Sequence, residues 1–350
     1  MIKEHLPKLA VLGAGGLGQE MLKLLAKRQN ANLVAIVDKN AYLYAENGLD
    51  LNELNQNFKG DVSSINNSVK SPNSIMSLLS LYGSEIDCLF YALPNLPTQF
   101  IPNLTKQIIE NTAFKGVIVD AIKRTSAVKL LMNLADDLKA KGILYLTGCG
   151  ATPGLLTSAA ALAAQSFVEI QSVKIIFGVG ISNWLGYRAT IREDIAHLSG
   201  FDIEKVNAMS EAEIDLELDK RNGILELVNM EHADDIMLEL AGICSADKVS
   251  VGGIVDTRNA QKPISTQVQI TGLTYQGKQS THTFKLGDET TMSANVNGTV
   301  LGYLNAGLYL QQEYGASGFK TAAEIKPRFA AVEMKREHKL FSENENLLKA

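Results

Sequence analysis

The sequence predicts an α/β fold: a Rossmann-type doubly wound parallel sheet, followed by a second α+β domain that contains a mostly antiparallel sheet. Three observations lead to this fold class. A glycine-rich turn at residues 13–18 stands between an apolar run and an amphipathic stretch, and apolar runs then alternate with helical patterns up to about residue 150. Beyond that point the hydrophobic period shifts toward two, which favours antiparallel strands. A chain of 350 residues exceeds the size at which one hydrophobic core stops growing, so two domains are expected.

The glycine turn and its flanks have the parts of a dinucleotide site. Gly13 permits the tight turn out of the first strand, Gly15 lets the backbone approach the pyrophosphate, and Gly18 lets the helix pack close to the sheet. The pyrophosphate would then lie on the free N–H groups at the positive end of that helix. A second apolar run ends on Asp38, which would accept hydrogen bonds from the adenosine ribose and favours NAD, although Lys39 follows and NADP is possible. The cofactor-binding residues predicted from this unit are Gly13, Ala14, Gly15, Gly16, Leu17, Gly18, Asp38 and Lys39.

Three further apolar runs are expected to extend the parallel sheet. These strands are expected at residues 87–94, 116–120 and 143–146. In an open α/β sheet the ligand lies at the carboxyl ends of the strands, near the point where strand order reverses. The loops at 92–94, 120–124 and 148–154 should therefore surround the nicotinamide. The residues predicted to line the cofactor in these loops are Ala92, Leu93, Pro94 and Cys149.

The second half of the chain is expected to bind the substrate. Its strands are expected at 173–179, 249–255, 266–274 and 280–286. The expected parts of the chain are a dinucleotide-binding domain at 1–150, a substrate and dimerisation domain at 151–290, a helix at 291–312 that packs back on the first domain, and a charged helical tail at 313–350. Residues 231–235 are expected to be the solvated start of a helix. Val268, Ile270 and Leu273 would leave an apolar sheet face to be buried, so a homodimer or tetramer is expected.

Composition and charge exclude several classes of function. The net charge is −5 and 46% of the residues are hydrophobic. The sequence has no basic stripe interleaved with aromatic residues, which argues against nucleic acid as a partner. It also has no run of eighteen apolar residues, which a membrane-spanning helix would need. The first eight residues lack the apolar core of a secretory signal. The 3 cysteines are widely spaced and form no metal-ligand pattern, so we expect a cytoplasmic protein without a metal centre.

A dense group of aromatic, basic and acidic residues in the second domain is the predicted substrate clamp. Arg188 and Arg192 are four residues apart, so on a helix they would share a face and could converge on a carboxylate. Trp184 and Tyr187 would exclude water and strengthen that pairing. The alternative is an exposed turn in which both arginines pair with surface acids. Tyr187 and His197 are candidates for the proton-transfer role, with a structural role as the alternative for His197.

Three motifs carry a resemblance to a known family. The glycine turn at 13–18, the strand end at 91–94 and the segment 148–155 resemble the saccharopine dehydrogenase-like oxidoreductases, over about residues 8–165. That family includes saccharopine reductases, lysine dehydrogenases and carboxynorspermidine-type dehydrogenases. Its loop after the sixth strand ends in Pro-Gly, which Pro153-Gly154 matches. The resemblance implies hydride transfer with NAD(H) or NADP(H) at a C–N centre of an amino acid.

Two departures from that family affect the predicted site. Thr152 stands where some relatives have an aspartate before the Pro-Gly pair, and it is a predicted substrate-binding residue. The segment 122–124 is instead similar to glucose-fructose oxidoreductase-like enzymes and homoserine dehydrogenases, which place a lysine near the nicotinamide to assist proton transfer. Lys123 is therefore a candidate catalytic residue if burial lowers its pKa. The alternative is a solvent-facing lysine at a helix start.

The predicted function is that of an NAD(P)-dependent oxidoreductase that acts on a small, carboxylate-bearing amino acid or imine. Two alternatives stay open. One is a reductase of a sugar, tetrapyrrole or semialdehyde that depends on Lys123, and the other is a dinucleotide-binding sensor without catalysis.

Overall fold

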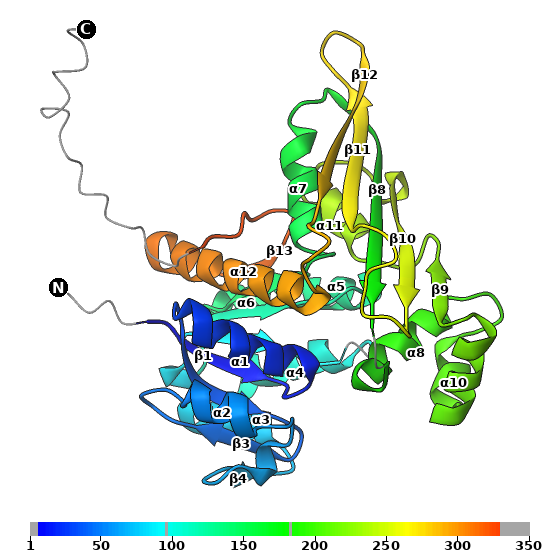
Figure 1. Cartoon of the computed structure of the whole chain (residues 1–350). Coiled ribbons are helices and arrows are strands. Elements are labelled where there is room, and N and C mark those ends of the chain that lie inside the picture. Colours follow the sequence, from blue (N-terminus) through cyan, green and yellow to red (C-terminus); the bar gives the residue numbers. More distant parts are fainter. Residues whose placement is uncertain (1–5, 95–96, 182–183, 330–350) are drawn as a thin grey trace, which may run out of the picture.

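The computed structural model describes residues 6–94, 97–181 and 184–329, which form two sheets with helices packed around them (Figure 1). The first sheet has eight strands and the second has five. The first is mostly parallel and the second is mixed, which confirms the predicted fold class. Within the described ranges, no helix combines the length and the apolar composition that crossing a membrane would need.

The strands of the first sheet are β1 (Lys8–Leu12), β2 (Asn32–Val37), β3 (Ala41–Tyr44), β4 (Val69–Lys70), β5 (Cys88–Tyr91), β6 (Val117–Asp120), β7 (Leu144–Thr147) and β13 (Gly318–Thr321). Their order is β13-β7-β6-β5-β1-β2-β3-β4. Neighbours are parallel except for the antiparallel pairs β2–β3 and β3–β4. Strand order therefore reverses at β1, which lies between β2 and β5. This reversal places a ligand-binding crevice at the carboxyl ends of β1 and β5.

Helices cover both faces of this sheet. One face carries α1 (Gly16–Arg28), α2 (Leu51–Asn57) and α12 (Met292–Tyr314), and the other carries α3 (Ser74–Tyr82), α4 (Phe100–Asn111), α5 (Thr125–Met132) and α6 (Ala135–Lys141). Short turns of 3₁₀-helix lie at Val62–Ser64 and Gly83–Glu85. Along β1, Leu9 and Val11 enter one core while Ala10 and Leu12 enter the other. The strand is apolar throughout because helices bury both of its faces.

The strands of the second sheet are β8 (Glu169–Gly180), β9 (Ile224–Leu227), β10 (Val249–Asp256), β11 (Gln267–Leu273) and β12 (Gln279–Lys285). Their order is β12-β11-β8-β10-β9, with β8–β10 parallel and the other three pairs antiparallel. Helix α7 (Leu155–Ala164) contacts β11, and Val268 and Ile270 are buried in the core beside it. Helix α7 thus covers the sheet face that was predicted to form a dimer interface, so the prediction of that interface is wrong. The homodimer itself stays a prediction.

The segment between β8 and β10 is mostly helical. Its elements besides β9 are η3 (Trp184–Tyr187), α8 (Arg188–Ala196), α9 (Ile203–Ala208), α10 (Glu211–Lys220), α11 (Asp234–Leu240) and η4 (Ala246–Lys248). Helix α10 begins with a capping box, in which Ser210 and Glu213 each bond the other's backbone N–H. The cap explains why a polar sequence forms a helix here.

The end of the described chain differs from the expected helical tail. Helix α12 lies alongside α1 on the first sheet (Figure 1), and β13 then adds a parallel strand to the edge at β7. The Tyr303 hydroxyl donates to the carbonyl of Ala322 at 2.8 Å, which fastens the segment after β13 to α12. The expectation of helix from residue 313 onward is therefore wrong for 315–329, while 330–350 lie outside the described residues.

Candidate active site

The glycine turn after β1 is too crowded for side chains at two of its positions. Gly13 has φ +114°, and a Cβ there would lie 2.1 Å from the carbonyl oxygen of Ala92. A Cβ on Gly18 would lie 2.0 Å from the carbonyl oxygen of Gly13. Glycine at these positions lets the turn pass close to the end of β5 and lets α1 pack on the turn.

Gly15 is glycine for a different reason. No heavy atom lies within 4 Å of a Cβ built at Gly15, so the space beside it is open. Helix α1 begins at the next residue and no side chain caps its start. Open space in front of uncapped N–H groups suits the pyrophosphate of a dinucleotide. The residues present therefore fit this cofactor, with the segment Gly15–Gly18 as its phosphate cradle.

Asp38 has a structural role that the sequence did not reveal, because its carboxylate accepts hydrogen bonds from the backbone. Its Oδ1 accepts from the backbone N–H groups of Asn40 and Ala41 at 2.8 and 2.9 Å, and its Oδ2 accepts from Val62 N–H at 2.7 Å. The carboxylate thus shapes the loop at the carboxyl end of β2, and Lys39 beside it is exposed. The preference for NAD over NADP stays a prediction, which competitive titration of the two cofactors tests.

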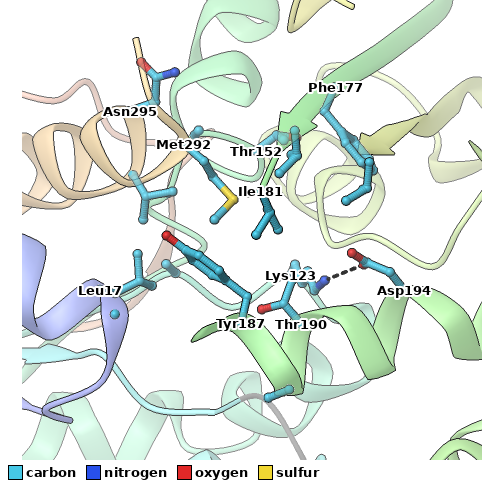
Figure 2. A pocket seen from close by; sticks show the side chains of 18 of the residues that line it. Leu17, Lys123, Thr152, Phe177, Ile181, Tyr187, Thr190, Asp194, Met292 and Asn295 are labelled. Atoms are coloured by element: carbon cyan, nitrogen blue, oxygen red, sulfur yellow. Dashed lines mark hydrogen bonds and ion pairs between the residues drawn. The ribbon is translucent and has the colours of Figure 1, made fainter. Parts of the chain in front are cut away.

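A cavity of about 380 Å³ opens next to the cradle, within the size range of small-molecule sites. The loops that follow strands of the first sheet contribute Gly15, Gly16, Leu17, Ala92, Leu93, Pro94, Ala121, Lys123, Gly150, Ala151 and Thr152 to its wall, and the second sheet and the segments joined to it contribute Phe177, Gly178, Val179, Ile181, Met230, Val255 and Leu286 among others. Figure 2 shows Leu17 and Tyr187 on one side of this space and Phe177 and Ile181 on another. Segments from both sheets therefore build one site.

Lys123 reaches this cavity from the loop after β6. Its Nζ lies 3.2 Å from Glu193 Oε2 and 3.3 Å from Asp194 Oδ1, both on α8. Burial alone would lower the pKa of Lys123, but the carboxylates of Asp194 and Glu193 outweigh it and leave that pKa above its usual value. Lys123 is therefore a partly buried ammonium group at neutral pH, and the expected lowering of its pKa is wrong.

The ion pairs of Lys123 continue behind the cavity wall. Arg124 Nε lies 2.7 Å from Glu193 Oε1, and a second guanidinium nitrogen lies 3.5 Å from a carboxylate oxygen of Glu231. Burial raises the pKa of Glu193, but Lys123 and Arg124 lower it more, so the net shift is downward. Burial raises the pKa of Asp194, which Lys123 offsets only in part. This network joins α8 of the second domain to the first domain.

A second polar group was missed by the sequence reasoning. His232 lines the cavity, and its Nδ1 lies 2.6 Å from Asp234 Oδ2. Asp234 also accepts from the hydroxyls of Thr152, at 2.8 Å, and Thr157. His232 and Asp234 are both buried, so the expectation of a solvated segment is wrong for 232–234, while Glu231 is exposed as expected. The signal was present in the His-Ala-Asp spacing, but nothing in the sequence showed that Thr152 and Thr157 would meet it.

Three residues predicted for substrate binding or catalysis, and Cys149 predicted to line the cofactor, lie elsewhere. Arg192 donates to the carbonyl of Val206, and Trp184 Nε1 donates to Asp215 at 2.8 Å; neither side chain lines the cavity. His197 ends α8, where its Nδ1 lies 2.8 Å from the carbonyl oxygen of Glu193, also outside the cavity wall. Cys149 is fully buried and is not part of the wall, and burial raises the pKa of its thiol.

Arg188 borders the cavity but is not a free clamp. Its Nε lies 2.7 Å from Glu211 Oε1, and its side chain is 54% exposed. Arg188 and Arg192 are thus engaged by different partners, and the predicted convergence on one anion is wrong. Tyr187 and Thr152 do lie in the wall. Tyr187 reaches the cradle, because its ring lies 3.9 Å from the position of a Cβ on Gly16.

Comparisons with known proteins agree with this geometry. A family model described as Glutamate/Leucine/Phenylalanine/Valine dehydrogenase matches residues 3–171. The (S)-8-amino-7-oxononanoate synthase BioU of Haloferax mediterranei is 40% identical over 351 residues, which cover 91% of this chain and 98% of that protein. Among solved structures, C. glutamicum DAP dehydrogenase in complex with DAP is 16% identical with a TM-score of 0.56, and an engineered D-amino acid dehydrogenase bound to NADP+ is 17% identical with a TM-score of 0.55. Each of these two comparisons covers 94% of this chain and 97% of the other, and at such identities they show a shared fold.

The fold, the phosphate cradle and the dehydrogenase family match define an enzyme of the NAD(P)-dependent oxidoreductase class. This is the broader class that the resemblance to saccharopine dehydrogenase-like proteins implied. Identity of 40% over nearly the full length shows the family more closely: the chain belongs to the family of the (S)-8-amino-7-oxononanoate synthase BioU.

Proposed function

We propose that this enzyme acts at the C–N centre of an amino-oxo carboxylate of the 8-amino-7-oxononanoate class. Such a compound has an amine next to a ketone at one end, an aliphatic chain, and a carboxylate at the other end. The observation that carries the proposal is the placement of the Lys123 ammonium group in a cavity that also borders the phosphate cradle. The relative's name supports the choice of this compound class.

The cavity wall at Lys123 suits an imine that is reduced to an amine. The bound nicotinamide would supply or accept a hydride at the reacting carbon. Lys123 would donate a hydrogen bond, and then a proton, to the oxygen or nitrogen attached to that carbon. Asp194 would hold Lys123 in place, since its Oδ1 accepts from Lys123 Nζ at 3.3 Å (Figure 2).

The apolar part of the cavity wall suits an aliphatic chain. It is formed by Phe177, Val179, Ile181, Met230, Val255, Leu286 and Met292. Burying methylene groups against such a wall contributes about 0.8 kcal/mol for each CH₂. A substrate without the chain would lose this contribution.

Lys262 is the residue we propose for the substrate carboxylate. Among the described residues, three lysine or arginine side chains border the cavity, namely Lys123, Arg188 and Lys262. Lys123 and Arg188 are paired with carboxylates, whereas Lys262 donates to two neutral oxygens, the carbonyl of Gly287 at 3.1 Å and the hydroxyl of Thr290 at 3.5 Å. A substrate carboxylate would therefore find a positive charge that is not already neutralised by a direct ion pair in the described part of the chain.

Turnover of defined compounds tests the proposal. The enzyme is mixed with NADH or NADPH, ammonium ions and 8-amino-7-oxononanoate, or with the oxidised cofactor and a diamino acid of the same length, while nicotinamide absorbance is followed. We expect cofactor oxidation or reduction that depends on the amine, the ketone and the carboxylate. A chain that binds the cofactor but changes its redox state with no member of this class would overturn the proposal.

A further inference from the structure

We propose that His232 is the general base of this site, which removes a proton from the substrate amine so that its nitrogen lone pair is free to react. The assignment rests on the proposed function, because it assumes an amine substrate. It adds a catalytic residue and a defined proton path to the Lys123 site. The geometry of a buried hydrogen-bond chain carries it.

This chain of hydrogen bonds fixes the orientation of the His232 imidazole ring. Gly154 N–H donates to Thr157 Oγ1 at 2.8 Å, which leaves the Thr157 hydroxyl hydrogen directed at Asp234 Oδ1. Thr152 donates to Asp234 Oδ2 at 2.8 Å, and His232 Nδ1 lies 2.6 Å from that same oxygen. Three donors therefore converge on the acceptor oxygens of one carboxylate.

This arrangement selects one tautomer of His232. Because Asp234 takes hydrogen bonds from two hydroxyl groups, it acts as the acceptor toward Nδ1 as well, and the ring hydrogen resides on Nδ1. Nε2 is then left with a lone pair. Since His232 lines the cavity and Asp234 does not, Nε2 is the ring nitrogen available to a ligand.

The other ionisable residues in the described cavity wall are unsuited to accept this proton. Lys123, Arg188 and Lys262 are cations, and Asp194 is already paired with Lys123. Tyr187 is a phenol, which donates rather than accepts a proton at neutral pH. His232 thus complements Lys123: the site has an ammonium acid and an imidazole base.

The proposed step is balanced within the site. An N–H bond of the substrate ammonium breaks, its electron pair stays on nitrogen, and a new N–H bond forms at Nε2 of His232. The resulting imidazolium is stabilised by Asp234. No oxidant or reductant takes part in this step, and solvent removes the proton from Nε2 afterwards.

Several charged groups lie in the same region as His232. Asp234 lies on α11, and the Lys123 carbonyl accepts from the N–H of the neighbouring Ala233 at 2.8 Å. The other charged groups of this region are Arg124 on the same loop as Lys123, Glu193 and Asp194 on α8, and Glu231, which precedes His232 in the chain. A variant of His232 is therefore compared with a variant of a histidine outside this region.

The test compares His232→Asn with a matched control, His282→Asn. Asparagine can keep the hydrogen bond to Asp234 but cannot act as the base, and His282 is exposed on β12 and does not line the cavity. We expect His232→Asn to lower kcat/KM by about 10²–10⁴-fold and to bind cofactor within about twofold of the parent. His282→Asn should keep the parent rate. A His232→Asn enzyme with the parent rate would overturn the assignment while leaving the proposed function intact.

Two further measurements keep the assignment testable if that variant is unstable or no substrate turns over. Exogenous imidazole should restore part of the activity of His232→Gly, which a purely structural role would not allow. In the parent enzyme, ¹⁵N NMR should show His232 with hydrogen on Nδ1 and none on Nε2. A neutral ring with hydrogen on Nε2 would refute the assignment, whether or not the amino-oxo carboxylate is the substrate.

Discussion

At the scale of single residues, the site depends on buried charges that are placed by contacts between the domains. Lys123 and Arg124 come from the first domain, while Glu193 and Asp194 come from the second. Removing one member of a buried ion pair leaves the other charge without compensation, which is destabilising. The same residues therefore serve both catalysis and the fixed position of α8.

Replacement of Lys123 should affect activity and stability together. Lys123→Met leaves Asp194 without its ion-pair partner, so we expect a loss of roughly 3–5 kcal/mol in the free energy of unfolding and loss of turnover. Lys129→Met, an exposed change on α5, is the control and should alter neither. Chemical denaturation and initial rates measure both effects, and full activity in Lys123→Met would exclude Lys123 from the reaction.

Gly15→Val should separate cofactor binding from folding. Its Cβ would enter open space at an ordinary φ of −75°, so thermal unfolding should be nearly unchanged, while NAD(H) and NADP(H) affinity should fall at least about tenfold, or ~1.4 kcal/mol. Gly13→Val, in contrast, should destabilise the fold because of its clash with Ala92. Unchanged cofactor affinity in Gly15→Val would remove the cradle from this position.

Lys262→Met should reveal how the substrate carboxylate is recognised. We expect KM to rise by about 10–100-fold for a carboxylate substrate, the equivalent of roughly 1.5–3 kcal/mol for a hydrogen bond to a charged group, and to stay the same for its methyl ester. Lys278→Met, on the exposed turn between β11 and β12, is the control. Equal effects of Lys262→Met on acid and ester would contradict this role.

At the scale of elements, the two faces of α8 explain why some predicted residues reach the site and others do not. Tyr187 at its N-cap, Thr190 and Asp194 follow one another at helical spacing and face the cavity (Figure 2). Arg192 lies on another side and bonds α9. The sequence shows the spacing of these residues but not the rotation of the helix, because the contacts that set the rotation come from distant segments.

The attachment of α8 to the first domain should depend on pH. The pKa of Glu193 is lowered in the folded protein, by the net effect described above. Its contribution is thus present above the ordinary pKa of 4.5 and is lost as pH falls through the lower folded value. Glu193→Gln should therefore be less stable than the parent at neutral pH, and the difference should shrink below about pH 4.5. A difference that is constant with pH would contradict the ion-pair account.

At the scale of the whole molecule, the sequence predicted the first domain better than the second. The buried parallel strands and the glycine turn are local signals, and the structure has them close to the predicted places, with β6 at Val117–Asp120 and β7 at Leu144–Thr147. Strand β13 and the chain His232–Asp234–Thr157 depend on long-range pairing. A short segment such as Gly318–Thr321 has no periodicity to reveal that it completes a sheet.

The most direct test of the central claim is turnover of an amino-oxo carboxylate by the purified enzyme, followed through nicotinamide absorbance and product mass. The account predicts a change in cofactor absorbance matched by a change at the C–N centre of 8-amino-7-oxononanoate or a close analogue, and it predicts that Gly15→Val and Lys123→Met both abolish it. Cofactor binding at the cradle without any reaction at such a centre, in either direction, would contradict the account.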